Sequence, residues 1–385
     1  MKIAVLHPQA KVMGGAVKML FLISAYLQNK NSVDFYTFSF DKANCFPELN
    51  KNLNIINLNL KGFSKFFGII SLSFSLRKYD IILAGNSPMH FVAVFAKIFN
   101  PRLKIFWYLQ NIPVYYLPQN KSVLVYFKRF FEKLIIGKID KIIVNSHFIK
   151  GEVLKYFNKE SEVIYPVIDT DFFVPHPTSP YQGEENTQEV DNISPPCQGE
   201  VRGGLSLFIN GRLVKGKNVE LAIKCFFELK DKYPNLKLYI SGDGEEKNKL
   251  ETLTHSSYSL SLWERVGVRE DIIFLGEINE DDVKKYYNKC SVCLFTSKID
   301  SFGLTIIEAM SCEKPVVSLR LGGAIEIIED GKTGFLAHDE NEFIQKIDNL
   351  LQNPELRAII GENARKFVVN NFSKNTLYSN LDKLI

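Results

Sequence analysis

The sequence predicts an α/β protein built from two parallel-sheet domains, and three observations support this prediction. The chain has 385 residues, more than one hydrophobic core usually serves. Short apolar runs typical of buried strands alternate with stretches whose apolar residues recur at helical spacing, such as Ala16–Gln28 and Ser122–Ile136. The same plan repeats in the second half. Strands that alternate with helices favour a parallel sheet covered on both faces, so we expect two Rossmann-like domains.

The expected strands are short apolar runs bounded by turn residues. In the first half they are Ile3–Leu6, Val33–Phe38, Leu53–Leu58, Asp80–Ala84, Leu103–Tyr108, Lys141–Asn145 and Glu162–Tyr165. In the second half they are Leu207–Asn210, Leu236–Ser241, Ile272–Leu275, Val292–Phe295 and Val316–Ser318.

Two segments interrupt this plan. Pro175–Gly204 is rich in Pro, Gly, Gln, Glu and Asn, a composition that cannot offset the entropy of ordering, so we interpret it as a flexible linker. It contains an imperfect repeat, Pro180–Glu184 and Pro196–Glu200. Thr254–Glu270 interrupts a helix-to-strand connection. Both resemble insertions, which loops tolerate at small entropic cost, and we expect neither to contribute to chemistry.

Composition sets the broad class of the protein. With 46% hydrophobic and 23% charged residues, the chain is typical of a globular protein. Its net charge of +4 is unevenly spread, because residues 1–170 carry +12 and the remainder −8. A basic first half fits an anionic partner such as a membrane surface or a nucleic acid, and it equally fits lysine-rich solvated helices.

The cysteines and the N-terminus indicate a reducing, cytoplasmic compartment. The six cysteines do not form a secreted disulfide framework. Cys290 and Cys293 have the spacing of a redox or metal pair, but they run into an apolar strand without a second Cys/His pair nearby, so buried small hydrophobes are the favoured interpretation. The start MKIAVLHP reads as a first strand rather than a signal peptide, and no apolar run is long enough for a membrane span.

The sequence places a basic loop, Asn210–Asn218, directly after a predicted strand. Ligands of parallel sheets bind at the carboxyl ends of strands, where this loop lies. Arg212 can grip a phosphate through two donors, and Lys217 and Lys215 offer point charges. Taken alone, these residues are better explained by an ordinary basic surface loop than by a phosphate site.

A second loop follows strand Val292–Phe295. A helix is expected to begin near Phe302–Leu304, and the free N–H groups of such a helix end attract anions. Glu308 lies inside this helix, where a carboxylate can accept hydrogen bonds from ribose hydroxyls, and Asp300 lies on the loop where a sugar would rest. The alternative is that Asp300 caps the helix and Glu308 is a solvated charge.

Glycine pairs mark two further turns. Gly322 and Gly323 follow strand Val316–Ser318 and precede Glu326, and they allow a ligand to approach the backbone. Gly14 and Gly15 stand between the first strand and helix, without the rest of a dinucleotide fingerprint, so NAD binding is poorly supported.

These motifs, taken in order, resemble a known family. G-R-x-x-x-x-K-N, G-D-G, F-L-G, D-S-F-G-x-x-x-x-E-A-M, K-P-V-V and G-G-x-x-E are similar to the retaining glycosyltransferases of family 4, the glycosyl transferases group 1. The resemblance implies the GT-B fold, two Rossmann-like domains facing across a cleft. It places an acceptor-binding domain at 1–172, a linker at 173–204, a nucleotide-sugar domain at 205–372 with an insertion at 254–270, and a helix at 373–385 that returns to the first domain.

The resemblance also implies roles for individual residues. Arg212 and Lys217 would bind the donor diphosphate, Glu308 the ribose, and Asp300 the transferred sugar. The remaining donor-binding positions are Gly14, Gly15, Gly211, Gly242, Gly276, Phe302, Gly303, Leu304 and Thr305. No metal or cofactor is implied, since cations and the helix end neutralise the leaving diphosphate. Asp169-Thr170-Asp171 has the spelling of a metal pair but resembles a structural landmark.

Three parts of the sequence depart from the family pattern. Asp300 stands where glutamate is usual, and Gln110 and Asn111 occupy a stretch that often holds a histidine. Either amide can still hydrogen-bond a sugar. His90 is a further candidate for acceptor or sugar contact, with a core or surface histidine as the alternative. Glu313 stands where glycine is common, and the sequence offers no functional account of it.

The resemblance predicts a hexosyltransferase that uses a UDP- or GDP-sugar and extends a glycan or lipid-linked acceptor in cell-envelope polysaccharide or lipopolysaccharide synthesis. Lys61–Tyr79 and Lys121–Lys141 mix basic and large apolar residues, so a peripheral contact with the cytoplasmic face of an anionic membrane is expected, with burial against the sheet as the alternative. The rival functions are a degenerate homologue that binds donor without transfer and a GT-B epimerase. A nucleic-acid-binding protein lacks any supporting motif.

Overall fold

A computed structural model of the chain describes residues 1–10, 14–43, 45–59, 64–111, 123–176, 204–255 and 271–384. The chain divides into two units, which we treat separately. Unit 1 comprises Met1–Val167 and Leu377–Ile385, and unit 2 comprises Ile168–Thr376. Most of each predicted insertion, residues 177–203 and 256–270, lies outside the described residues.

Unit 1 is built on a sheet in which every strand pairing is parallel, with the order β3-β2-β1-β4-β5-β6-β7. Its strands are β1 (Lys2–His7), β2 (Ser32–Thr37), β3 (Asn54–Asn57), β4 (Ile81–Ala84), β5 (Lys104–Leu109), β6 (Lys141–Val144) and β7 (Glu162–Val163). Its helices are α1 (Gly15–Leu27), α2 (Pro47–Asn50), α3 (Ser64–Ser75), α4 (Met89–Phe99), α5 (Val123–Ile135), α6 (His147–Phe157) and most of α15 (Lys374–Leu384), with short 3-10 turns η1 (Leu76–Lys78) and η3 (Ile136–Lys138).

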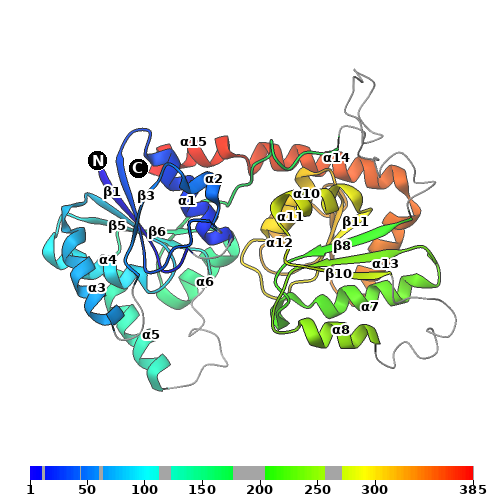
Figure 1. The fold of residues 1–385 in the computed structure, drawn as a ribbon, viewed down its shortest axis with the longest axis horizontal. Helices are drawn as coiled ribbons and strands as arrows, with labels where there is room; N and C mark the ends of the chain where they lie inside the picture. The colour runs from blue at the N-terminus through cyan, green and yellow to red at the C-terminus, as the bar shows by residue number, and fades with distance from the viewer. Residues whose placement is uncertain are drawn as a thin grey trace. The chain divides into compact units, whose positions relative to one another are not determined.

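Helices cover both faces of this sheet (Figure 1). Because side chains alternate along a strand, neighbouring residues enter different cores: Ile82 and Trp107 pack with α3, α4 and α6, whereas Leu83 and Phe106 pack with α1 and α15. Within unit 1, the ring of Tyr378 on α15 stacks on Tyr26 of α1, with ring centroids 4.2 Å apart. The last helix is thereby part of the unit 1 core.

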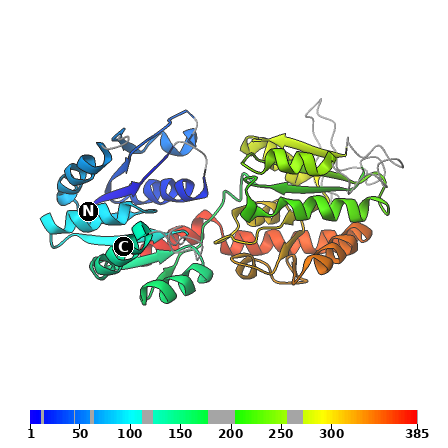
Figure 2. The same ribbon diagram turned by 90° about the horizontal axis from the view of Figure 1, so that it is seen from below.

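Unit 2 has a second sheet with only parallel pairings, in the order β10-β9-β8-β11-β12-β13. Its strands are β8 (Ser206–Asn210), β9 (Lys237–Ser241), β10 (Ile272–Gly276), β11 (Val292–Phe295), β12 (Val316–Leu319) and β13 (Phe335–Ala337). Its helices are α7 (Val219–Lys230), α8 (Lys247–His255), α10 (Glu280–Lys289), α11 (Leu304–Ser311), α12 (Ala324–Ile327), α13 (Glu340–Gln352) and α14 (Pro354–Asn371), with a 3-10 turn, η4 (Lys215–Lys217). Figure 2 shows helices on both sides of this sheet.

The predicted α/β class with two parallel sheets is confirmed. Each predicted strand is present, with its ends shifted by no more than two residues. The prediction missed β13, because three residues, Phe335–Ala337, are too short to give a periodic signal. Among the described residues, no helix has both the length and the apolar character needed to cross a bilayer.

Candidate donor site in unit 2

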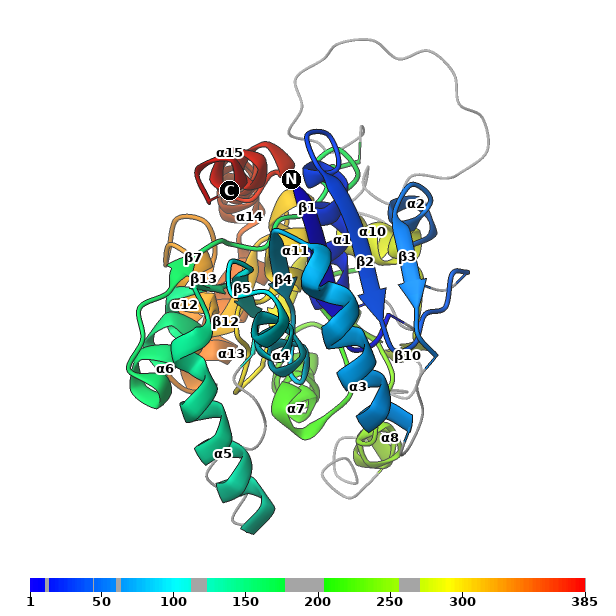
Figure 3. The same ribbon diagram turned by 90° about the vertical axis from the view of Figure 1, so that its left-hand side faces the viewer.

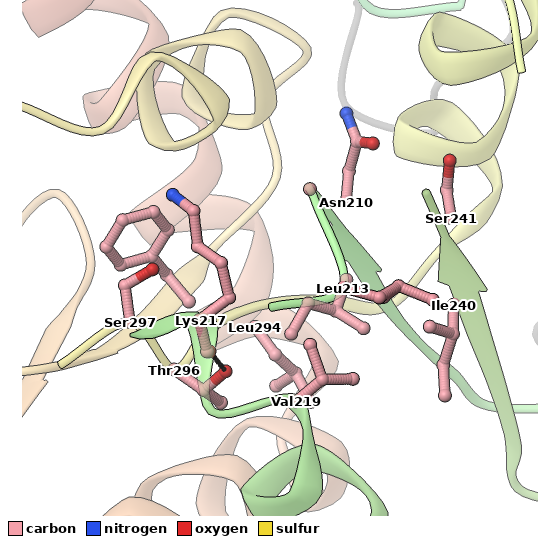
Figure 4. A pocket seen from close by; sticks show the side chains of 12 residues that line it. Asn210, Leu213, Lys217, Val219, Ile240, Ser241, Leu294, Thr296 and Ser297 are labelled. Carbon is pink, nitrogen blue, oxygen red and sulfur yellow. Dashed lines mark hydrogen bonds between the residues drawn. The ribbon is translucent and has the colours of Figure 1, made fainter. Parts of the chain in front are cut away.

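The candidate site lies at the carboxyl ends of β8 and β11. These strands are neighbours in the sheet although they are not consecutive along the chain, so the connections diverge here to opposite sides of the sheet. Ligands of open parallel sheets bind at such a switch point. A pocket opens at this place (Figure 4). Its lining comprises Ile209, Asn210, Gly211, Leu213, Lys217, Val219, Ile240, Ser241, Leu294, Phe295, Thr296 and Ser297.

The basic loop after β8 is fixed to the loop after β11 by two hydrogen bonds. Thr296 Oγ1 donates to the carbonyl of Lys217 at 2.7 Å, and the backbone N–H of Lys298 donates to the carbonyl of Gly216 at 3.0 Å. These bonds hold η4 at the pocket. Lys217 itself lines the pocket, where its ammonium group pairs with the carboxylate of Asp300. The structure therefore brings together two of the four residues expected to be catalytic.

Arg212 lies on the same loop but in a different environment. Its side chain is exposed, and within the described residues no hydrogen bond or ion pair engages its guanidinium group. An exposed guanidinium at the end of a parallel strand can bind an anion through two parallel N–H donors. The loop thus offers one cation paired within the protein, Lys217, and two that are exposed, Arg212 and Lys215.

The first turn of α11 begins four residues after Asp300, the partner of Lys217. Gly303 is the N-cap, with φ 108°, and a Cβ at this position would lie 2.8 Å from Ile306 Cδ1, so the sharp entry into the helix requires glycine. Leu304 and Thr305 are the first two helical residues, whose N–H groups have no acceptor inside the helix. With the helix dipole, this end favours an anion. The side chain of Phe302 is buried and points into the core instead, against Phe372.

A second glycine turn, Gly322–Gly323, packs directly against the Asp300 loop. The N–H of Gly323 donates to the carbonyl of Asp300 at 3.2 Å, and a Cβ on Gly322 would lie 2.3 Å from the same oxygen. Phe302 N–H donates to Asp300 Oδ1 at 3.4 Å. Gly322 and Gly323 are therefore explained by contact with this loop, and Asp300 is held in place by backbone contacts as well as by Lys217.

Glu308 has a partner that the sequence analysis missed. The hydroxyl of Tyr287, on α10, lies 3.2 Å from Glu308 Oε2 and 3.3 Å from the carbonyl of Thr305, and Asn210 Nδ2 lies 3.5 Å from it. Burial first, and then the Glu308 carboxylate, raise the pKa of Tyr287 well above its ordinary value, so the hydroxyl keeps its proton. Tyr287 thus orients the carboxylate expected to bind ribose. Only an aromatic residue in an amphipathic helix marked this position in the sequence.

Gly242 and Gly276 are explained by backbone packing. The N–H of Gly242 donates to the carbonyl of Gly276 at 2.7 Å. Gly242 has φ 124°, and a Cβ there would lie 1.9 Å from the carbonyl oxygen of Gly211. Gly211, Gly242 and Gly276 therefore bring the loops after β8, β9 and β10 into close contact beside the pocket. This packing explains the three glycines without any contact with a donor.

The candidate residues of unit 1 form no comparable cluster among the described residues. Gly14 is the N-cap of α1 and Gly15 its first residue, with the preceding residues 11–13 outside the described part. Gln110 is buried and its side-chain amide donates to the carbonyl of Ala16 at 3.3 Å, while Asn111 is exposed. The Gln110 amide is thus near the start of α1, at the carboxyl end of β5.

His90 lies in the core, contrary to the interpretation of this residue as a substrate contact. Its side chain is 0% exposed, stacks on Trp107 with ring centroids 4.2 Å apart, and places Nε2 2.8 Å from a carboxylate oxygen of the equally buried Glu132. Burial lowers the pKa of His90, against the opposing effect of Glu132. The burial favours the alternative interpretation, a core histidine with a partner.

The remaining residues that the sequence analysis singled out have structural roles. Cys290 and Cys293 are buried, with their Sγ atoms 3.2 Å apart, as expected of core residues. The carboxylate of Asp169 pairs with Lys374 and caps a turn through the N–H groups of Asp171 and Phe172. Within the described ranges, His, Cys, Asp and Glu form no group of three or more that could hold a metal ion.

The fold and the site together define a class: a protein of two parallel α/β units, with a cationic loop and a helix N-terminus at the switch point of the second. Residues 13–172 match the family Glycosyltransferase Family 4, and residues 200–367 match Glycosyl transferases group 1. The chain belongs to this family of glycosyltransferases and has the GT-B fold.

Three known proteins illustrate the similarity. Over its whole length the chain is 25% identical to the alpha-1,3/1,6-mannosyltransferase ALG2 of Dictyostelium discoideum and covers 98% of that protein. It is 31% identical over 176 residues, 45% of this chain and 44% of the relative, to the capsular polysaccharide biosynthesis glycosyltransferase CapM of Staphylococcus aureus. The crystal structure of Anabaena HepE in complex with UDP and glucose matches with a TM-score of 0.75 at 21% identity, covering 100% of this chain and 99% of HepE.

Proposed function

We propose that this protein is a retaining hexosyltransferase that moves a sugar from a UDP- or GDP-sugar to a glycan or lipid-linked acceptor of the cell envelope, in polysaccharide or lipopolysaccharide synthesis. The observation that carries the proposal is the pairing of Lys217 with Asp300 at the switch point of unit 2, four residues before the N-terminus of α11. Arg212 is an exposed cation on the same loop as Lys217. The relatives support the transferred group and the acceptor class, since one is a mannosyltransferase and another acts in capsular polysaccharide biosynthesis.

Each site residue has a role that its chemistry suits. Arg212 and Lys217 neutralise the departing diphosphate together with the N–H groups of Leu304 and Thr305, which is electrostatic stabilisation of a leaving group. Glu308, oriented by Tyr287, accepts hydrogen bonds from the ribose hydroxyls. No protein cofactor or metal ion enters this scheme, and the nucleotide-sugar is a co-substrate.

The transfer proceeds on one face of the sugar. The bond from the anomeric carbon to the diphosphate oxygen breaks, the acceptor hydroxyl oxygen forms the new bond to that carbon, and the departing diphosphate oxygen takes the hydroxyl proton. Asp300 binds hydroxyls of the transferred sugar once a donor has separated it from Lys217.

The first experiment is thermal unfolding of the protein in the presence of UDP, GDP and ADP and their common sugar conjugates. A ligand at about 100 times its Kd adds about 2.7 kcal/mol of stability, enough for a clear rise in Tm. We expect a shift for one nucleotide family, lost in Arg212→Ala and Lys217→Ala. Lys237→Ala, at the amino end of β9, is the matched control and should keep the shift.

Three outcomes would contradict the proposal. If the Tm of the folded protein rises with none of the nucleotides, the proposed donor site is absent. A shift without sugar transfer to any lipid-linked or glycan acceptor would favour the degenerate homologue, for which the pairing of Lys217 with Asp300 and the engagement of Gln110 by Ala16 are the supporting observations. Release of an epimerised sugar without an acceptor would instead identify an epimerase.

A further inference from the structure

Unit 1 carries a set of large apolar side chains that are exposed instead of packing in its core. They belong to three helices that lie side by side over one face of the sheet, α3, α4 and α5 (Figure 3). These side chains, with exposed fractions between 39% and 68%, are Ile70, Phe74, Phe95, Ile98, Phe99, Tyr126, Phe130 and Leu134. We call this set the helical apolar face. Scattered single residues of this kind are ordinary on a protein surface, whereas a contiguous set marks an interaction site.

The face is continuous across the helices. The rings of Phe74 on α3 and Phe99 on α4 meet edge-on, with centroids 5.3 Å apart. One turn earlier on α4, the ring centroids of Phe95 and of Phe131 on α5 lie 6.4 Å apart. The exposed residues therefore form one surface rather than three separate stripes.

Helix α4 is apolar on both sides, which a surface helix of a globular protein is not. In α4, Val92, Ala93 and Ala96 are fully buried against the sheet, yet Ile98 and Phe99 on the outer side are 68% and 47% exposed. A helix that is apolar all round needs a second apolar environment besides its own core. Burial against the sheet, the alternative interpretation of the sequence, accounts for the inner side alone.

The charges beside the helical apolar face indicate what this second apolar environment is. Lys97 on α4 is paired with Asp140, 2.6 Å away, whereas α5 carries three basic residues, Lys128, Arg129 and Lys133. The single acidic residue of α3, α4 and α5, Glu132, is fully buried. On α5 the basic residues flank the exposed stripe: Arg129 and Lys133 lie next to Tyr126 and Phe130 at helical spacing, and the Arg129 guanidinium lies 5.7 Å from the centroid of the Tyr126 ring.

A rim of cations adjoins the rings at the other edge as well. The guanidinium carbon of Arg77 lies 3.5 Å from the centroid of the Phe74 ring, and Lys78 beside it is exposed. Large apolar side chains ringed by Lys and Arg suit an anionic lipid bilayer, whose headgroups meet the cations while the rings enter the acyl boundary. A second copy of the chain would bring the same positive charge against itself, which is unfavourable.

We propose that the helical apolar face is the surface on which this protein docks on a membrane of anionic lipids. The biological purpose of this docking rests on the proposed function. The docking adds to that function the surface through which unit 1 would reach a lipid-linked acceptor. Binding to vesicles needs neither donor nor acceptor. It can therefore be measured whether or not transfer occurs.

The test is sedimentation of the full chain with vesicles of phosphatidylcholine alone and of phosphatidylcholine with phosphatidylglycerol. We expect binding to the anionic vesicles that weakens as salt is raised. Replacing Tyr126, Phe130 and Leu134 by serine should weaken the partition by at least about tenfold, because each loses buried apolar surface. Ile359→Ser, on α14 of unit 2, removes an equally exposed apolar side chain (57%) and should bind as the native chain does.

Charge is tested separately from apolar contact. Arg129→Gln with Lys133→Gln should remove the preference for phosphatidylglycerol and leave weak binding to phosphatidylcholine. Each variant must keep the native Tm and the native rise in Tm with nucleotide, which separates loss of docking from loss of the donor site. Binding by the serine variant equal to that of the native chain, absence of vesicle binding by the native chain, or a dimer in light scattering that the serine substitutions dissociate would each overturn the proposal.

Discussion

The ammonium group of Lys217 is bonded to the carboxylate of Asp300, so the cation expected to receive the donor diphosphate already has an anionic partner in the protein. Both side chains are partly buried, with exposed fractions of 25% and 17%. A diphosphate that reaches Lys217 must displace Asp300 or share the cation with it. Displacement frees the carboxylate at the moment when sugar hydroxyls arrive.

This competition predicts opposite effects of one substitution on binding and on transfer. Asp300→Asn should bind the free nucleoside diphosphate more tightly, by roughly threefold to tenfold, because the competing charge–charge hydrogen bond, worth about 1 kcal/mol, is lost. Transfer should fall by about a hundredfold, since the sugar loses a charged acceptor. Isothermal titration with the diphosphate and a transfer assay measure the two effects. Asp231→Asn, an exposed carboxylate at the far end of α7, should change neither, and weaker diphosphate binding by Asp300→Asn would contradict the competition.

Arg212 and Lys217 should differ in how replaceable they are. Each alanine variant is expected to lower kcat by about 10²–10³, the typical loss of one group that stabilises a leaving anion. Arg212→Lys should recover little of this activity, because a point charge does not reproduce two parallel donors. Lys217→Arg should recover more, provided that its longer side chain still reaches the pocket. Steady-state kinetics measure all four, and near-normal turnover in either alanine variant would remove that residue from the site.

Tyr287 is expected to act on ribose recognition through Glu308. Tyr287→Phe removes the hydroxyl 3.2 Å from Glu308 Oε2 and should weaken nucleoside diphosphate binding roughly fivefold, the worth of one hydrogen bond of about 1 kcal/mol. Inorganic pyrophosphate, which has no ribose, should bind as before. Combined with Glu308→Gln, the effect should be less than additive, because the two residues act as one unit. Tyr286→Phe, the neighbouring position, is the control. A loss of pyrophosphate affinity would indicate a general disturbance of the pocket.

The sequence predicts what local pattern encodes. Buried strands and the loops that follow them were predictable, because apolar runs and turn residues mark them directly. The role of Tyr287 was not predictable, because its partner Glu308 is twenty-one positions away. The Tyr287 hydroxyl meets the Glu308 carboxylate only because the fold brings α10 next to α11. Lys217 and Asp300 were each predictable as site residues, but their pairing depends on how the two loops fold at the sheet edge.

His90 is a residue whose environment the sequence pattern does not decide. The sequence left open whether it contacts substrate or is a core or surface histidine, and the structure turns it inward against Trp107 and Glu132. Which side of a helix faces the sheet is decided by the whole apolar pattern of α4, and that helix is apolar on both sides, so the pattern does not assign His90 to either side.

Glu313 has a backbone explanation that predicts a stabilising substitution. It has φ 57° and follows α11, where Lys314 N–H bonds to the Ala309 carbonyl and Glu313 N–H to the Met310 carbonyl, the pattern of a Schellman cap. Glycine is favoured at that position because a Cβ strains the left-handed conformation. Glu313→Gly should therefore raise the free energy of unfolding by roughly 0.5–1 kcal/mol, the left-handed penalty reduced by glycine's greater freedom in the unfolded chain.

Denaturant unfolding of unit 2 measures this change. Glu313→Ala keeps the Cβ and removes the carboxylate, whose pKa is raised by burial despite Arg365 nearby. It should give no gain if the backbone is the cause. An equal gain in both variants would assign the effect to the half-buried charge instead.

His7, at the end of β1, should make unit 1 less stable as pH falls below neutrality. Its side chain is 6% exposed, and burial lowers its pKa from 6.5 to about 4, against a weaker opposing effect of the hydrogen bond to the Gln9 carbonyl. The unfolded chain binds this proton below about pH 6.5 and the folded chain does not, so stability rises with pH across this window. From about pH 6.5 down to about pH 4 the native chain should lose up to about 3 kcal/mol through this group.

Urea unfolding across this range measures the loss for unit 1. Fluorescence of Trp107 in a Trp263→Phe background reports on unit 1, since Trp107 lies in β5. In His7→Gln the part of the slope due to this group should disappear, while His147→Gln, an exposed histidine of the same unit, should keep it. His90 is present in all three proteins, so its own titration cancels in the comparison. If His7→Gln and the native chain lose stability in parallel between about pH 6.5 and about pH 4, the burial of His7 does not govern the acid sensitivity of unit 1.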